Sequence, residues 1–362
     1  MTTPVPLRYD PSQETIADDE TETIQKLQSA LQEIGDTTFR NSGHGYRTVH
    51  AKSHALLVGE FEVLPLDRLE LAQGLFRKPG VHPAVIRIST NPGDMLDDAI
   101  SVPRGLALKV LDVEGEHLQP DGARTQDFVM VNGPAFLAPD PKAFAKNLTL
   151  LAKTTDRAPG LKKAFSALAR GVEHAIEAVG GESATLKALG GHPQTNPLGE
   201  SYFSQTPFLY GDYVAKFSLQ PASPNLLALK DAPIDLNGDP DGIRAAMVDF
   251  FRTGEAMWEF KAQLRTDEQR MPIEDASKPW PEDASPFVTV ARLRVGPQTA
   301  WTQERSSLVD DGMAFSVWQA LAAHRPLGGV NRARRSTYAM SKNLRARHNA
   351  CPVHEPTSVN LL

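Results

Sequence analysis

Short β-rich runs separated by turns, without regular helices between them, constrain the fold of this chain most strongly. Most of the turns contain Pro, Gly or Asp, which favour tight chain reversals. Parallel strands need long crossover connections, usually helices, so the pattern predicts an α+β protein built on an antiparallel sheet or barrel. The runs are Tyr46–Val63, Val85–Ser89, Leu106–Val113, Phe128–Val131, Tyr213–Leu219, Trp258–Leu264 and Phe287–Val295.

Amphipathic segments predict helices around this sheet, because their apolar residues recur three or four positions apart. We expect Gly35 to end the first of them, Gln220–Asp241 to form a long loop, and residues 142–200 to form an insertion between strands or a separate domain. The chain becomes helical again after residue 314. The predicted helices are Thr15–Ile34, Pro141–Lys153, Leu161–Val179 and Asp241–Arg252, followed by a basic stretch at Asn331–Arg347.

The composition of the chain limits the partners and the cellular compartment that we expect for it. Its 38 Lys and Arg against 44 Asp and Glu leave a net charge of −6, which gives no overall attraction to nucleic acid or an anionic membrane. The single Cys351 cannot form an internal disulfide, and no stretch approaches ~18 uninterrupted apolar residues. We therefore expect a cytoplasmic protein without membrane or nucleic-acid partners. Hydrolase, Rossmann and P-loop signatures are missing from the sequence.

The pair His50 and His54 raises the question of a metal site, since residues four apart share one face of a helix. The apolar and β-branched residues around them favour a strand instead, and Ala51 stands where a zinc protease would carry its glutamate. Zinc is therefore disfavoured, and a histidine with a purely structural role is the ordinary alternative.

Arginines within apolar or turn segments indicate buried anionic partners. Arg47, Arg87 and Arg104 are of this kind, and a buried guanidinium is costly unless an anion or carboxylate satisfies it. The partner is either a bound ligand carrying carboxylates or phosphates, or an internal carboxylate such as Asp98 or Asp127.

The basic stretch contains Arg334, Tyr338 and Arg345, which return to nearly the same face of a helix. A guanidinium near a phenol stabilises phenolate, the form that ligates iron. The alternative is a solvated basic helix whose tyrosine packs inward. A nucleic-acid-binding helix is disfavoured, because no companion motif is present.

These segments, in this order, resemble the haem catalase superfamily over about residues 46–347. RTVHAKSHALLVGEFEV resembles the distal R-x-V-H-A-K motif and the F-E-V that follows it. VIRIST and PRGLALKV resemble the R-F-S-T and P-R-G-x-A-x-K runs. Val131–Phe136 resembles N-N-T-P-x-F, and Trp258–Trp280 resembles the late barrel strand. Arg334–Tyr338 matches R-x-x-x-Y, with Arg345 at the next arginine of the family.

The resemblance implies a catalase-type antiparallel β-barrel with surrounding helices, which binds haem b through a Tyr338 tyrosinate that Arg334 keeps deprotonated. Arg47, Arg87 and Arg345 would pair with the haem propionates, and Val49 and Phe136 would also contact the haem. His50 would move a proton between the oxygens of a bound peroxide, Ser89 would orient His50, and Asn132 would be the second distal donor.

Three departures from the family pattern are visible. Without a gap, the distal asparagine aligns with Val131, so either Asn132 shifts into place or the second donor is lost. One extra position lies between Lys52 and Phe61, where His54 occupies a region normally rich in glycine and alanine. The chain is also shorter than a typical catalase, which favours peroxidase chemistry.

We therefore expect a haem peroxidase, active as a homo-oligomer, that reduces hydrogen peroxide or an organic hydroperoxide while oxidising a small donor. The alternatives are a catalase, an enzyme that rearranges lipid hydroperoxides, and a non-catalytic haem carrier or sensor. Val49 is similar to the residue that catalases carry immediately before the distal histidine, where rearranging relatives tend to carry threonine. The expected organisation is an arm and helix at 1–45, a haem-binding core at 46–347 and a tail at 348–362.

Overall fold

Eight antiparallel strands close into a barrel in the computed structural model, which describes residues 5–152 and 193–360. Neighbouring strands follow the order β5-β4-β3-β2-β1-β9-β8-β7, and pairing of β5 with β7 closes the ring, while β6 pairs with the other side of β7. The strands are β1 (Lys52–Val63), β2 (Gly80–Thr90), β3 (Arg104–Val110), β4 (Gln126–Val131), β5 (Tyr202–Phe203), β6 (Phe208–Tyr210), β7 (Tyr213–Pro221), β8 (Ala256–Leu264) and β9 (Val288–Val295).

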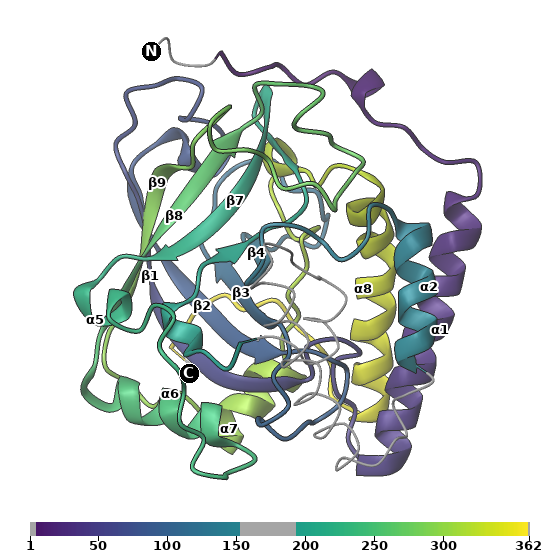
Figure 1. Ribbon diagram of the computed structural model, residues 1–362, viewed down its shortest axis with the longest axis vertical. Coiled ribbons are helices and arrows are strands. Elements are labelled where there is room, and N and C mark those ends of the chain that lie inside the picture. Colours follow the sequence, from purple (N-terminus) through teal and green to yellow (C-terminus); the bar gives the residue numbers. More distant parts are fainter. Residues whose placement is uncertain (1–4, 153–192, 361–362) are drawn as a thin grey trace, which may run out of the picture.

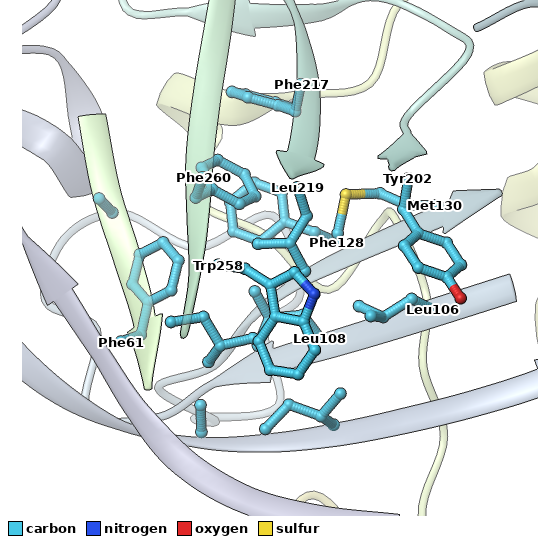
Figure 2. Close-up of a cluster of buried hydrophobic side chains, with 14 of the residues drawn as sticks. Phe61, Leu106, Leu108, Phe128, Met130, Tyr202, Phe217, Leu219, Trp258 and Phe260 are labelled. Atoms are coloured by element: carbon cyan, nitrogen blue, oxygen red, sulfur yellow. The ribbon is translucent and has the colours of Figure 1, made fainter. Parts of the chain in front are cut away.

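The barrel interior is a packed core (Figure 2). The ring centroids of Phe128 and Phe260 lie 4.6 Å apart, and Phe61 meets Phe260 edge to face at 5.3 Å. Trp258 and Phe217 are fully buried beside them. Because alternate residues of a strand face opposite sides of the sheet, the polar residues between these core positions lie on the outer face of the barrel.

Three long helices stand together on one side of the barrel (Figure 1). They are α1 (Glu20–Ser42), α2 (Pro141–Ala152) and α8 (Gly329–His348). Leu27, Leu31 and Ile34 of α1 form a small core with Leu148 of α2 and Ala333 of α8. This helical layer places the basic stretch of the sequence opposite the outer face of the barrel.

The remaining helices cover one end of the barrel or connect strands. The α-helices are α5 (Pro224–Leu227), α6 (Gly242–Thr253) and α7 (Gln303–Ser306), and α7 continues into a π-helical turn, Ser307–Asp311. The 3-10 turns are Pro11–Gln13, Gly74–Arg77, Pro197–Gly199 and Ala322–His324. No helix within the described ranges is long and apolar enough to cross a membrane.

The predicted antiparallel barrel is confirmed, and several boundaries need correction. The first helix does not end at Gly35 but continues to Ser42, and Gly43 caps it with a left-handed φ of 70°. A β-carbon at Gly35 would lie 2.6 Å from Leu344, so this glycine allows α1 and α8 to approach closely. The segment 220–241 contains α5 rather than loop alone. The helix expected at 161–179 lies outside the described residues.

Candidate functional site

His50 lies in the bend that precedes β1, with a left-handed φ of 55°. Arg87 of β2 holds this bend by donating hydrogen bonds to the carbonyl oxygens of His50, at 2.9 Å, and Ala51, at 3.1 Å. The Nδ1 atom of His50 is 3.4 Å from the hydroxyl oxygen of Ser89. A non-glycine residue with positive φ is strained and persists where its surroundings fix it, and here several contacts do so.

The imidazole of His50 rests on Gly105 of β3. A β-carbon at Gly105 would lie 2.6 Å from Cε1 and 2.7 Å from Nδ1 of His50. Ser89, Gly105 and Val131 are direct partners across β2, β3 and β4, so they form one row on the outer face of the barrel. The missing side chain of Gly105 thus makes the space that the imidazole fills.

The environment of His50 keeps its imidazole neutral. Burial, together with the positive charges of Arg87 and Arg334, lowers the pKa of His50 to about 3. A neutral imidazole has one nitrogen that can accept a proton and one that can donate it. At neutral pH this side chain is therefore unprotonated, the form from which a histidine can accept a proton.

Replacement of Gly105 with alanine should displace the imidazole while leaving the barrel intact. We expect Gly105→Ala to reduce peroxide turnover about 100-fold, because a misplacement of about 1 Å has an effect of that order. Hemin binding should persist. Gly296→Ala is a matched control, since a β-carbon there would meet nothing within 4 Å. Turnover of the Gly105 variant equal to that of the control would refute this role.

Three arginines gather beside this bend, namely Arg47, Arg87 and Arg345. The Nη2 atom of Arg47 donates to the carbonyl oxygens of Val309, at 2.9 Å, and Met313, at 3.1 Å; Arg345 of α8 donates to the same Met313 oxygen at 2.8 Å. Burial and the mutual repulsion of the guanidinium groups lower the pKa of Arg47, and burial lowers that of Arg345 to about 10. The cluster therefore favours additional negative charge.

The π-helical turn supplies the internal carboxylate of this cluster. Asp310 accepts a 2.6 Å hydrogen bond from Nε of Arg87 and a 2.7 Å bond from Ser53. Burial raises the pKa of Asp310, but Arg87 and Arg47 outweigh this effect and hold it below its ordinary value.

Internal carboxylates do lie beside Arg87 and Arg104, but they are not the two that the sequence suggested. Asp98 pairs with Lys52 and Asp127 with Lys109, rather than with an arginine of the cluster. Arg104 instead lies 3.7 Å from Glu200, on the inner face of the barrel end. The acidic partner of Arg87 is Asp310, which is more than 200 positions away in the chain.

Tyr338 lies in the middle of α8 and is half-buried. Within the described part of the chain, its hydroxyl group has no hydrogen-bond partner. Arg334, one turn earlier, donates to Thr206 at 3.1 Å and to Asn331 at 3.2 Å, and its guanidinium lies 5.5 Å from the centre of the Phe136 ring. These contacts fix Arg334 on the helix face that also carries Tyr338.

A direct contact joins the His50 segment to the Tyr338 helix. The hydroxyl of Thr48 donates a 2.9 Å hydrogen bond to Ser341, one turn beyond Tyr338. Arg345 then lies seven positions beyond Tyr338, on nearly the same face. The structure thus brings His50 and the arginine cluster together between the outer face of β2–β4 and α8, the helix that carries Tyr338.

Asn132 lies in a different environment from His50. Its Oδ1 atom accepts a 2.9 Å hydrogen bond from the Arg104 backbone, and its amide nitrogen donates to the buried carboxylate of Glu200. Asn132 follows Val131 and continues the inner-face row of Thr90 and Arg104. The structure therefore places Val131, not Asn132, on the face that carries the imidazole.

His54 explains the extra position in the sequence. The register of β1 against β2 shifts between Ser53 and Ala55, so His54 is the additional residue of a β-bulge. Its Nε2 atom is 3.0 Å from the hydroxyl of Thr90, whereas His50 contacts Ser89. The two histidines thus lie on opposite faces of β2, and the described ranges contain no group of three His, Cys, Asp or Glu side chains that could hold a metal ion.

Several contributors to the site were missed in the sequence. Asp310 lies in a run of two aspartates that carries no distinctive signal, and Thr48 is one of several threonines. Gly105 was visible as the glycine of PRGLALKV, but only the strand register shows that it supports His50.

The residues at this site fit a haem group. The Nε atoms of Arg47 and Arg345 are buried, with no hydrogen-bond partner in the described chain, and they suit the carboxylates of two propionates. Val49, next to His50 in the chain, is 38% exposed and offers an apolar surface that a flat ring could cover. A tyrosine stands on the opposite element, and phenolate is an established ligand of haem iron.

Comparisons with known proteins place the fold. No family model and no curated sequence matches the chain. Among solved structures, it resembles a fungal catalase with 17% identity and a TM-score of 0.59, covering 90% of this chain and 67% of the other. It resembles catalase A from Saccharomyces cerevisiae with 18% identity and a TM-score of 0.59, covering 98% of this chain and 74% of the other. It resembles a bacterial catalase with 18% identity and a TM-score of 0.56, covering 98% of this chain and 67% of the other. The chain therefore has the catalase fold.

Proposed function

We propose that this protein is a haem-dependent peroxidase that reduces hydrogen peroxide or an organic hydroperoxide and oxidises a small donor. The observation that carries the proposal is the imidazole of His50, seated on Gly105 in a segment that Thr48 joins to the helix of Tyr338, beside an arginine cluster. Its geometry suits proton transfer within a small bound molecule, and the catalase fold supports peroxide as that molecule.

Each set of residues has a distinct task in this proposal. Tyr338 would hold the haem iron as tyrosinate, and Arg47 and Arg345 would hold the propionates. Arg87, which already pairs with Asp310, would add positive charge beside them. When bound, haem b supplies a redox-active iron that takes up the oxidising equivalents of the peroxide. His50 accepts the proton of one peroxide oxygen and returns it to the other, which leaves as water or alcohol. Ser89 keeps the ring oriented by its contact with Nδ1.

The overall reaction needs an electron donor. A hydroperoxide ROOH and a donor AH2 give ROH, water and A, so two electrons and two protons pass from the donor to the peroxide. A haem carrier or sensor would need Tyr338 but not a positioned base, so the contacts that fix His50 favour an enzyme. Val49, in place of threonine, disfavours the rearrangement of lipid hydroperoxides.

The experiment compares two rates in the hemin-loaded protein. Oxygen release from hydrogen peroxide measures catalase activity, and peroxide-dependent oxidation of an aromatic donor such as guaiacol measures peroxidase activity. We expect donor oxidation to dominate. Oxygen release faster than donor oxidation would identify a catalase instead, and haem transfer to an acceptor protein without peroxide consumption would identify a carrier.

A further inference from the structure

We infer that Val131 is a specificity-determining residue that directs this site towards organic hydroperoxides and away from the oxidation of a second hydrogen peroxide. The inference rests on the proposed function and deepens it, because it names the class of peroxide. It follows from strand register, from the hydrogen bonds of Asn132 and from the chemistry of the side chain beside the imidazole.

The register places Val131 next to the imidazole. Gly105 pairs with Ser89 on one side and with Val131 on the other. A side chain at position 105 would point into the ring of His50. Directly opposed residues in antiparallel strands point to the same face, with β-carbons about 5 Å apart. The methyl groups of Val131 therefore form an apolar wall on one side of the imidazole of His50.

The neighbouring amide does not replace this wall. The amide nitrogen of Asn132 donates to Glu200, which also accepts a 2.6 Å hydrogen bond from Thr195. The amide oxygen of Asn132 accepts a hydrogen bond from the backbone N–H of Arg104. Turning Asn132 towards His50 would leave the buried Glu200 carboxylate without that donor, which is costly in a low-dielectric environment. A one-residue slip of β4 would also turn the core residue Met130 outward.

An apolar wall affects the two possible reactions differently. In the catalase reaction, two hydrogen peroxide molecules give two water molecules and oxygen, and the second peroxide serves as the electron donor. This second hydrogen peroxide is small and polar, and it loses a hydrogen-bond donor when valine, rather than asparagine, stands at position 131. An organic hydroperoxide instead places its alkyl group against the methyl groups, and its electrons come from a separate donor as ROOH and AH2 yield ROH, water and A. Apolar contact therefore favours the second reaction.

The main test is Val131→Asn in the hemin-loaded protein. We expect the ratio of oxygen release to guaiacol oxidation to rise about 10-fold or more, and the preference for tert-butyl hydroperoxide over hydrogen peroxide, compared as kcat/KM, to fall by a similar factor. Val129→Asn is the matched control, since Val129 lies on the same face of β4 opposite Ala107, one row away from Gly105. Its ratios should stay near those of the unmodified protein.

A second readout needs no haem. Titration of His50 by 15N NMR in the haem-free protein should give a higher pKa in the Val131→Asn variant, because the amide is a more polar neighbour than valine. Val129→Asn should leave this pKa unchanged. Val131→Thr, which keeps the shape of valine, provides a second variant that should move both readouts in the same direction by a smaller amount.

The outcomes separate the inference from the proposed function. If the unmodified protein binds hemin and uses peroxide to oxidise guaiacol, but neither Val131 variant changes the ratios or the titration of His50, then the inference is wrong and the proposed function stands. If the unmodified protein consumes no peroxide, then the proposed function fails and the inference fails with it.

Discussion

His50→Ala should bind hemin like the unmodified protein and lose peroxide-dependent oxidation by a factor of about 100 to 10,000, the usual contribution of a positioned acid–base group. The effect should be large because His50 is the imidazole that Gly105 and Ser89 hold in place on the outer face of the barrel. Its backbone carbonyl, which accepts a hydrogen bond from Arg87, survives the substitution. Stopped-flow measurement of peroxide consumption checks the rate.

His82→Ala is a suitable control for this experiment. His82 lies on β2, near the opposite end of the strand from Ser89, and its ring contacts the Leu111 carbonyl oxygen at 3.2 Å. Exogenous imidazole should restore part of the turnover of His50→Ala, because the removed ring leaves a space of its own shape. Full turnover without imidazole would remove His50 from the mechanism.

Tyr338→Phe should weaken hemin binding at least about 100-fold, since phenylalanine offers no oxygen to the iron and even residues that only support a metal ligand contribute 10- to 100-fold. The haem-free protein should fold with nearly unchanged stability, because the Tyr338 hydroxyl has no hydrogen-bond partner among the described residues. Absorption titration with hemin gives the affinity, and thermal unfolding of the haem-free protein gives the stability.

Tyr213→Phe provides the comparison for a tyrosine outside the site. Tyr213 begins β7, and its ring lies beneath the guanidinium of Arg8 at 5.7 Å. Hemin affinity of this variant should match that of the unmodified protein. Equal affinities for Tyr213→Phe and Tyr338→Phe would show that the iron ligand lies elsewhere in the chain.

Much of the barrel could be predicted because its long strands carry strong local signals. Val85–Ser89 and Trp258–Leu264 alternate or concentrate apolar residues as strands do, and both lie within observed strands. The closing strand could not be found in this way. Tyr202–Phe203 is only two residues long, and its place is set by pairing with both Val131 and Leu219, a long-range relation without a local pattern.

The first helix shows how tertiary packing overrides a local stop signal. Gly35 resembles a helix terminator, yet the helix continues because this glycine lets Leu344 and Thr48 approach the backbone. The same principle limits the prediction of the site. The motifs identified His50, Tyr338 and the arginines, whereas their supports, Asp310, Gly105 and Thr48, depend on contacts between distant segments.

Absorption spectroscopy after addition of hemin to the purified protein tests whether the site holds haem through Tyr338. We predict saturable binding of one hemin per chain, with a Soret band of high-spin ferric haem carrying a tyrosinate ligand. A protein that stays colourless after hemin addition and removal of the excess would contradict it.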